Sequence, residues 1–387
     1  MNHDSHQNQD TPADPVAAVT HADPYPYYAA LREGTPLAWN DRLGLWVASR
    51  ADVVEQVLQA HGALRVRPAA EPVPRAIVGS AAGEVFAQLV RMNDGPAHAA
   101  QRPALQRALA GLDLDAVHAA ALQVAQRVPA AQPLSDTLFA LPVQSVAHLL
   151  GFGDEALPQV ERWMRDFVAC LSPLSTAEQL QQASAAAGAL MTRFEALAAG
   201  TAPRHGTLLH SVVTGSAAPS RALLANLVGL LSQTCDATAG LLGNSLVALV
   251  REPALRGPCA RPGLQAIVEE TARHDPSVHN TRRFAAQPLT LAGARIAAGD
   301  AVLVLLASAQ RDPAFNPEPD RFMTVRARRR LLGFGHGLHA CPGQALACTL
   351  AAAGLEALLR RAPDLDALRL RGWGYRPSVN TRIPLFH

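Results

Sequence analysis

The sequence predicts a mainly helical protein with a small strand-rich part, folded as one large domain. Long segments rich in Ala, Leu, Gln and Val have helical spacing of their apolar residues and few β-branched runs. Strand-like material is sparse and mostly late in the chain. We find no internal repeat and no linker within the 387 residues. One large domain is therefore expected, although length alone would allow two or three.

The elements follow in order along the chain. Residues 1–20 are predicted to be a disordered lead, and patterned sequence starts at Asp23. Pro103 is expected in the first turns of its helix, where a missing N–H is tolerated. The expected helices cover 55–60, 85–89, 98–112, 114–130, 140–151, 155–171, 176–200 and 221–252. The expected strands cover 45–47, 289–296, 302–306 and a tail around 378–385.

Composition excludes several classes of protein. The 49% hydrophobic content is too high for a disordered chain. The charge is balanced, with 34 basic and 32 acidic residues, which disfavours nucleic acid as a partner. All basic side chains are arginine, which together with the Ala-rich runs indicates a GC-rich bacterial genome. Five scattered cysteines, no signal peptide and no apolar run of ~18 residues favour a cytoplasmic protein without a membrane span.

The most informative segment is 331–347, which is rich in glycine and contains Cys341. Its Gly-x-Gly-x-x-Ala pattern at 335–340 formally matches a dinucleotide-binding fingerprint. That fingerprint follows a buried strand in a βαβ unit, whereas here arginines precede it and Cys-Pro-Gly follows. A zinc site from His336, His339 and Cys341 is a second alternative, but no fourth ligand lies nearby in the sequence.

A third interpretation is thiolate ligation of haem iron. Closely spaced glycines let a backbone approach a flat macrocycle, and a helix that begins after Cys341 favours the thiolate. Residues 334–343 have the pattern Phe-Gly-x-Gly-x-His-x-Cys-x-Gly, which resembles the haem-binding signature of the cytochromes P450. The resemblance implies that Cys341 is the proximal ligand of a haem b iron and that His339 binds a haem propionate. It also implies that the cofactor loop includes Phe334, Gly335 and Gly343.

Other segments resemble the same family. Glu270 and Arg273, about seventy residues before the cysteine, resemble the Glu-x-x-Arg pair that supports the proximal core. Arg283 resembles the arginine that pairs with a propionate, and an arginine suits this through its fork of donors. His98 and Arg102 resemble the pair that holds the other propionate. The similarity covers roughly 20–387 and implies the cytochrome P450 fold, a large helical domain around a buried haem with a small β-rich lobe, as one domain over 21–387.

The helix over 221–252 departs from the family pattern. Asp236 keeps the acid, but Thr234 stands where Gly is expected and Ala237 replaces the usual Thr. Oxygen activation needs protons, and a hydroxyl there normally holds a water chain. We expect assistance from Asp236 with either Thr238 or a water ordered by the substrate. Use of hydrogen peroxide, a different oxidation, or a register shifted by one residue are the alternatives.

The resemblance also indicates where substrate and partner bind. Pocket candidates are Thr234 on the distal helix and Val278, His279 and Asn280 after Arg273, a polar stretch that suits a substrate with hydrogen-bonding groups. His279 and Asn280 could equally bond to backbone or to a propionate, and Cys235 is a further residue that could face the pocket. An arginine cluster before the cysteine loop (Arg326, Arg328, Arg329 and Arg330, with Arg107) would suit an acidic ferredoxin.

These features predict a bacterial haem-thiolate monooxygenase of specialised metabolism. It would oxidise a small organic substrate with O2 and with electrons from ferredoxin and ferredoxin reductase, as a monomer. The alternative is an atypical haem-thiolate enzyme, either a peroxygenase or a coupling, ring-forming or rearranging oxidase, because Ala237 replaces the usual threonine.

Overall fold

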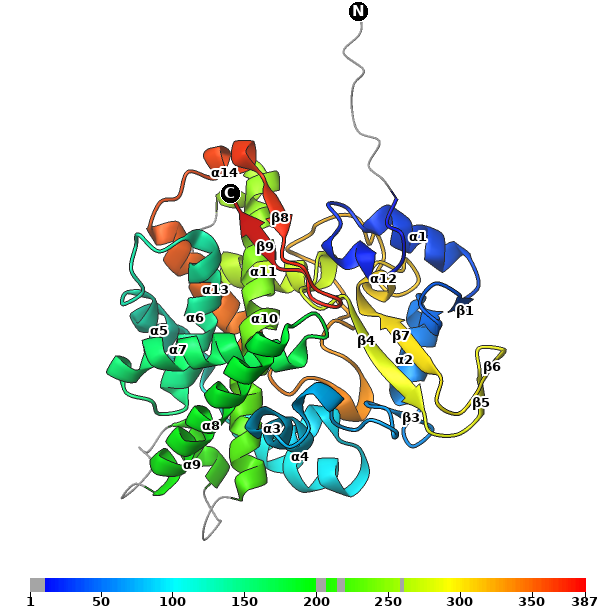
Figure 1. Ribbon diagram of the computed structural model, residues 1–387. Helices are drawn as coiled ribbons and strands as arrows, with labels where there is room; N and C mark the ends of the chain where they lie inside the picture. The colour runs from blue at the N-terminus through cyan, green and yellow to red at the C-terminus, as the bar shows by residue number, and fades with distance from the viewer. Residues whose placement is uncertain (1–10, 200–206, 214–219, 258–260) are drawn as a thin grey trace, which may run out of the picture.

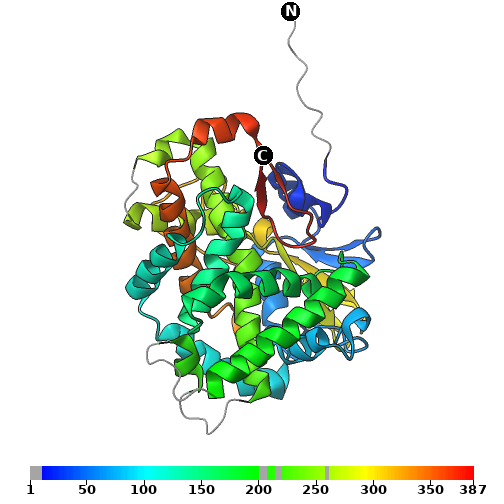
Figure 2. The same ribbon diagram turned by 60° about the vertical axis from the view of Figure 1, so that its left-hand side comes forward.

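The computed structural model describes residues 11–199, 207–213, 220–257 and 261–387. Most helices lie on one side of the molecule, and the main sheet lies on the other side together with α1 (Tyr25–Glu33), α2 (Ala51–Gln59) and α12 (Leu306–Gln310) (Figure 1). The same division is visible after a turn of 60° (Figure 2). The predicted class, mainly α with a small β part, is confirmed.

The helices and strands have the following bounds. The α-helices are α1 Tyr25–Glu33, α2 Ala51–Gln59, α3 Ala81–Gln88, α4 Gly95–Ala110, α5 Leu114–Ala125, α6 Leu134–Leu149, α7 Leu157–Phe167, α8 Ala177–Ala199, α9 Leu208–Val213, α10 Arg221–Arg251, α11 Arg261–His274, α12 Leu306–Gln310, α13 Gln344–Arg360 and α14 Leu365–Arg371. The strands are β1 Leu37–Asn40, β2 Leu45–Ala48, β3 Leu64–Arg65, β4 Asn280–Ala285, β5 Leu289–Leu291, β6 Ala294–Ile296, β7 Ala301–Leu305, β8 Trp373–Tyr375 and β9 Pro384–Phe386.

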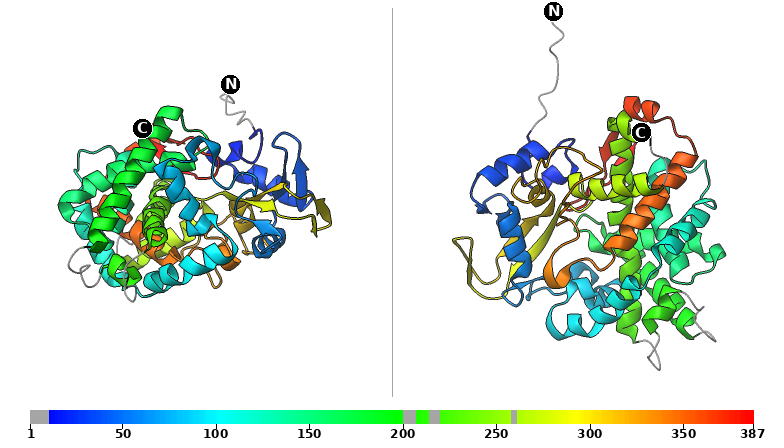
Figure 3. Two further views of the ribbon diagram at one scale, coloured as in Figure 1. Left: turned by 60° about the horizontal axis from the view of Figure 1, so that its bottom comes forward. Right: turned by 180° about the vertical axis from the view of Figure 1, so that it is seen from behind.

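Helix α10 is the longest helix that the structure describes and runs through the middle of the helical part. Its 31 residues begin after Ser220, whose hydroxyl accepts a hydrogen bond from the Leu223 N–H as an N-cap. Most of its side chains are buried, because α6, α8, α11 and α13 surround it. Viewed nearly end-on, it stands inside a ring of other helices (Figure 3, left). A helix that is apolar on nearly all sides is expected in such a position.

The main sheet has five strands in the order β1-β2-β7-β4-β3. Strand β2 pairs with β7 in parallel, and the other neighbours are antiparallel. Short hairpins are formed by β5 with β6 and by β8 with β9. The strand expected over 289–296 is therefore wrong as a single strand. It is interrupted at Ala292 and Gly293, both of which have positive φ and make a tight turn.

The disordered lead predicted for 1–20 is wrong for residues 11–20, whereas 1–10 lie outside the described residues. A 3₁₀ helix, Ala17–Thr20, places Ala18 and Val19 fully in the interior. The Asp14 carboxylate accepts hydrogen bonds from the N–H groups of Val16 and Ala17 and pairs with Arg42 at 3.1 Å. Burial of Ala18 and Val19, together with this turn, orders the segment.

Pro103 also differs from expectation. It is the ninth residue of the 16-residue helix α4 and not in its first turns. Its missing N–H leaves the carbonyl four residues earlier, at Ala99, without its helical donor. Both residues are exposed, so water can satisfy that carbonyl and the helix continues through the proline.

Within the described residues, Gly337–Arg360 is the one continuous segment long and apolar enough to cross a membrane. Helices α4 and α5 together also pass this test as a pair bent by 83°. Most of the first segment is α13, which is buried against α5, α10 and α11.

Candidate active site

The loop before α13 presents Cys341. Its backbone N–H donates to the Phe334 carbonyl at 2.7 Å, which closes the loop on itself. Gly335 and Gly337 have φ of 74° and 69°, a conformation that favours glycine. A Cβ on Gly337 would lie only 2.9 Å from Nε2 of His61, so this position has no room for a side chain.

The environment of Cys341 raises the pKa of its thiol overall, so the thiolate depends on a positive partner such as a metal ion. The residue is exposed, in contrast to the buried Cys170, Cys235 and Cys348. Burial of the thiol among nearby atoms raises its pKa, while the Gly343 N–H and the Arg102 guanidinium lower it. Helix α13 begins three residues after the cysteine, as the sequence predicted. Its N-terminus and the Gly343 N–H therefore lie on the side of the sulfur.

A group of basic side chains surrounds this loop. The rings of His98 and His339 lie 4.6 Å apart between centroids. Arg102 donates a hydrogen bond to the Ala340 carbonyl, which brings α4 onto the cysteine loop. Arg283 is buried on β4, and among the described residues it donates to the Thr281 hydroxyl and to the Arg282 carbonyl. The structure thus brings together the four basic residues that the resemblance implied as propionate ligands.

Two ring nitrogens of this basic group have no hydrogen-bond partner among the described residues. Nε2 of His98 and Nδ1 of His339 are buried without a partner in the described part of the chain. The nearby acid is Asp94, which contacts Nε2 of His339 at 2.9 Å and accepts from the Val66 N–H. Burial lowers the pKa of His98, Arg102 and Arg283. Buried donors in excess over acceptors require an anionic ligand, and two carboxylates beside a thiolate ligand fit haem b.

His61 belongs to the same surroundings and was not found by sequence reasoning. Its Nε2 lies 3.4 Å from the Leu338 N, and burial together with the positive His339 lowers its pKa. His61 follows α2, far from the cysteine loop in sequence, and no motif marks it. Only the docking of α2 onto the loop reveals it.

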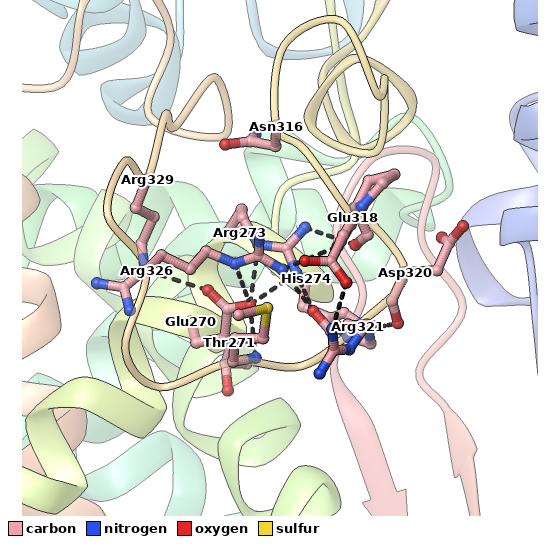
Figure 4. Close-up of polar contacts among 12 residues, drawn as sticks. Glu270, Thr271, Arg273, His274, Asn316, Glu318, Asp320, Arg321, Arg326 and Arg329 are labelled. Atoms are coloured by element: carbon pink, nitrogen blue, oxygen red, sulfur yellow. Dashed lines mark hydrogen bonds and ion pairs between the residues drawn. The ribbon is translucent and has the colours of Figure 1, made fainter.

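Glu270 and Arg273 form the centre of a buried ion-pair cluster (Figure 4). Both side chains have 0% exposure, and Nη2 of Arg273 lies 2.7 Å from Oε1 of Glu270. Arg326 and Arg329 also bind Glu270, at 2.8 and 3.2 Å. Arg273 donates further to the carbonyls of Pro319 and Arg321. The cluster therefore fastens the segment before the cysteine loop to α11.

Gln310 is a further residue that the sequence did not indicate. Its Oε1 accepts from the N–H groups of Leu332 and Gly333 at 2.8 and 2.6 Å. Its Nε2 donates to the carbonyls of Ala272 and Arg273 at the end of α11. Gln310 is fully buried and thus sets the start of the cysteine loop against α11.

On α10, the five residues at the atypical position have different surroundings. The carboxylate of Asp236 pairs with Arg376 of the C-terminal hairpin at 2.6 Å, and its Oδ1 has no hydrogen-bond partner among the described residues. Ala237 is partly exposed. The hydroxyl of Thr238 is buried and equally without a described partner.

Thr234 donates its hydroxyl to the Leu230 carbonyl. Cys235 is fully buried and donates to the Leu231 carbonyl, so the suggestion that it faces a pocket is wrong.

The pocket positions after α11 need a similar correction. His279 has 0% exposure, and its Nδ1 lies 3.0 Å from the Tyr28 hydroxyl. Asn280 is buried and donates to the Val379 carbonyl. Both side chains bind protein groups, and their assignment to a pocket wall is wrong. Val278 forms an isolated antiparallel β-bridge with Thr381 through its backbone. It is partly buried, so of these three residues it is the one with an accessible side chain.

The structure contradicts the two other interpretations of the glycine-rich loop, a dinucleotide-binding fingerprint and a zinc site. The loop follows irregular chain and lies outside any βαβ unit, which excludes the dinucleotide fingerprint. No three His, Cys, Asp or Glu side chains in the described ranges are placed to hold a metal ion, which excludes the zinc site.

A helical fold with a cysteine-bearing loop and unpaired basic groups around it defines a haem-thiolate protein. The family model "Cytochrome P450" matches residues 248–361. Cytochrome P450 144 of Mycobacterium tuberculosis is 30% identical over 305 residues, which cover 75% of this chain and 69% of that protein. The chain belongs to the cytochrome P450 family.

Two further relatives extend over most of the chain. The 20-oxo-5-O-mycaminosyltylactone 23-monooxygenase of Streptomyces fradiae is 29% identical and covers 92% of this chain and 88% of its own. The crystal structure of CalO2 superimposes with a TM-score of 0.83 at 26% identity, covering 97% of this chain and 98% of that one. The protein is therefore a monooxygenase that uses haem b, O2 and external electrons to oxidise a small molecule.

Proposed function

We propose that Cys341 is the axial thiolate of the haem in a monooxygenase of bacterial specialised metabolism. The observation that carries this is the exposed Cys341 beside a basic group in which Nε2 of His98 and Nδ1 of His339 are buried without a described partner. When bound, the haem supplies an iron that activates O2 with two electrons. His98 and Arg102 of α4 bind one propionate, and Arg283 and His339 bind the other. Glu270 and Arg273 position the loop and do not touch the haem.

The residues of α10 govern how protons reach the distal side. The unpartnered hydroxyl of Thr238 and the free Oδ1 of Asp236 are the two polar atoms available for this. Ala237 cannot hold a water as a hydroxyl would. The second candidate function, an atypical haem-thiolate oxidation such as peroxygenation or oxidative coupling, is favoured by this same substitution and by the engagement of Asp236 with Arg376.

The substrate class follows from the relatives. The similar Streptomyces fradiae enzyme is named for the substrate 20-oxo-5-O-mycaminosyltylactone. We infer that this chain also acts on a small organic molecule of specialised metabolism, as a single domain over 21–387 and as a monomer.

Ferredoxin, reduced by its reductase, is the proposed electron donor, but the docking surface differs from the sequence prediction. Arg326 and Arg329 are engaged by Glu270, and Arg330 pairs with Glu55 at 3.0 Å. Arg328 and Arg107 remain exposed. A groove of about 550 Å³ beside the cysteine loop is lined in part by Arg329, Pro342 and Gln344, and Arg328 directly precedes Arg329, so we place the acidic partner on this face.

The test of the core proposal is the spectrum of the reduced carbon monoxide complex. The wild type is expected to show the red-shifted Soret band of a thiolate-ligated haem. Cys341→Ala should lose this band, and Cys348→Ala should keep it because that thiol is buried on α13. A wild-type spectrum without the thiolate band, or a band retained in Cys341→Ala, contradicts the assignment.

The two candidate reactions are separated by the source of oxidant. With ferredoxin, its reductase and O2, the monooxygenase is expected to turn over faster than with hydrogen peroxide alone. Arg328→Glu should raise the KM for ferredoxin without changing the KM for peroxide. Faster turnover with peroxide would favour the alternative.

A further inference from the structure

Arg91 is a partly buried arginine on the α10 side of the site. It belongs to a short 3₁₀ helix, Val90–Met92, between α3 and α4. The Val90 N–H donates to Oδ1 of Asn226 on α10 at 2.7 Å. Leu89 packs so closely on Gly229 of α10 that a Cβ there would lie 2.7 Å from Cδ2 of Leu89. These contacts hold the backbone of Arg91 directly beside α10.

The other end of this segment reaches the cysteine loop. Asp94, three residues after Arg91, contacts His339 and the Val66 N–H. Asn93 fills the space between them by donating to the carbonyls of Ala87 and Leu89. Arg91 is therefore placed between the proposed haem loop and the part of α10 that carries Asp236.

The guanidinium of Arg91 has no ion pair and no hydrogen bond to any residue that the structure describes. Its Nε is a buried atom without a partner. Burial lowers the pKa of Arg91, and the titratable groups close enough to oppose this are Cys170 and Asp236. Asp236 is already paired with Arg376 at 2.6 Å, and burial raises the pKa of Cys170 to about 12, which keeps that thiol neutral. One positive charge is thus left without a counter-charge.

Such a charge is unfavourable unless a ligand pairs with it. Arginine does not lose its proton in proteins, and Arg91 is partly buried with its Nε fully covered, so its charge is less well solvated than a surface charge. The propionates already have His98, Arg102, Arg283 and His339 as proposed partners, whereas the segment of Arg91 is held against Asn226 and Gly229 of α10. The unpaired cation therefore belongs to the substrate side and not to the propionate group.

We propose that Arg91 is the recognition residue for a carboxylate on the substrate. The inference rests on the proposed function and specifies its substrate class, a small organic acid whose carboxylate is bound between the Val90–Met92 segment and α10. The fork of guanidinium donors matches a carboxylate bidentately, which would fix the orientation of the substrate.

Matched acid and amide probes test this on the ferric holoprotein. The pairs are 4-ethylbenzoate with 4-ethylbenzamide and decanoate with decanamide, and their dissociation constants come from the shift of the Soret band and from calorimetry. In the wild type, the acid of at least one pair should bind about tenfold more tightly than its amide. Arg91→Gln should bring the ratio close to one. Arg91→Lys should keep part of the preference for the acid. Arg193→Gln, which changes an exposed arginine of α8, should keep the full preference.

A stability measurement adds an independent readout. Arg91→Met removes the unpaired charge but keeps an unbranched side chain, so the ligand-free holoprotein should melt higher, by on the order of 1–3 °C. A lower melting temperature would show that Arg91 already has an essential partner and would overturn the proposal. No acid preference in the wild type, including no binding of either acid, or an unchanged preference in Arg91→Gln, also overturns it.

The carbon monoxide spectrum separates this outcome from failure of the proposed function. If Arg91→Gln has the thiolate band and the same acid preference as the wild type, only the carboxylate assignment is wrong. If the wild type lacks the thiolate band, the proposed function fails and the substrate assignment fails with it.

Discussion

Thr238 shows how one missing hydrogen bond points to function. Its hydroxyl is buried on α10 and has no partner among the described residues, next to the alanine that departs from the family pattern. Helical threonines usually bond to the carbonyl four residues earlier, as Thr234 does with Leu230. A hydroxyl left free in this way can bind water or substrate.

Thr238→Val tests this role, because valine keeps the shape and removes the hydroxyl. Product formed per electron consumed should fall about tenfold or more if the hydroxyl relays protons, while the melting temperature stays unchanged or rises. Ser245→Ala is the control, since that hydroxyl on the same helix is already bonded to the Leu241 carbonyl. Unchanged coupling in Thr238→Val rules out the relay.

His274, at the end of α11, is a residue whose charge state the structure determines. Arg311 can only donate, so its Nη2 at 3.0 Å makes Nδ1 of His274 an acceptor. Nε2 then carries the proton and donates to the Asp320 carbonyl. Burial, together with the positive Arg311, lowers the pKa of His274 from 6.5 to about 3.

This lowered pKa predicts a dependence of stability on pH. Between about pH 6.5 and 3 the unfolded chain binds a proton at His274 and the folded chain does not. The free energy of unfolding therefore falls as the pH falls through this window, by about 1.4 kcal/mol per pH unit from this group. In urea unfolding, the free energy of unfolding of His274→Gln should depend less steeply on pH than that of the wild type, by the equivalent of one bound proton. An equal slope in variant and wild type would mean that another group is responsible.

At the scale of elements, α11 acts as the anchor of the chain that leads to the cysteine loop. Glu270 accepts from Arg273, Arg326, Arg329 and the Met323 N–H, while Gln310 fixes the loop to the end of the same helix. The segment 317–330 contains no helix or strand, so side-chain bonds replace a backbone ladder there.

Glu270→Gln tests this anchor. It keeps the shape but removes the charge that three arginines share, which leaves Arg273 and Arg326 buried and uncompensated while Arg329 keeps Glu269. A loss of about 3–5 kcal/mol in the free energy of unfolding is expected, with a lower haem content after purification. Glu269→Gln is the matched control, because its one ion pair within the described residues is with Arg329, its other bond is from the neutral Gln265 amide, and its side chain is 38% exposed. Its cost should stay below about 1 kcal/mol, and equal effects of the two variants would contradict the anchor.

At the scale of the whole molecule, the two ends of the described chain are joined. Arg382, before β9, donates to the carbonyls of Val19, His21 and Ala22 and pairs with Asp275 at 3.1 Å. It is 1% exposed and stacks on Tyr375 at 3.5 Å. The N-terminal segment therefore covers a charge that the C-terminal hairpin could not bury alone.

Removal of residues 2–20 tests this connection, with removal of 2–10 as the reference. The longer deletion removes the buried Ala18 and Val19 and takes away the Val19 carbonyl from Arg382, so its melting temperature should be several degrees below that of the shorter one. Equal melting temperatures would mean that residues 11–20 contribute nothing to stability.

Much of the site could be predicted because its residues lie close together in sequence. Cys341 with its glycines, Glu270 with Arg273, and His98 with Arg102 each fall within one or two turns of chain. Local spacing then decides which side chains share a face or a loop. The sequence by itself therefore determined the fold class, the haem loop and the departure at Ala237.

Only the tertiary structure decided which distant groups meet. His61, Gln310 and Asp94 reach the loop from separate elements, and Arg326 and Arg329 are engaged inside the protein although their sequence resembles a surface cluster. Whether a charge is paired, as in Asp236, or left alone, as in Arg91, depends on side chains tens to hundreds of residues away. Packing sets these contacts, because a buried charge or donor is stable only where another part of the chain, or a ligand, completes it.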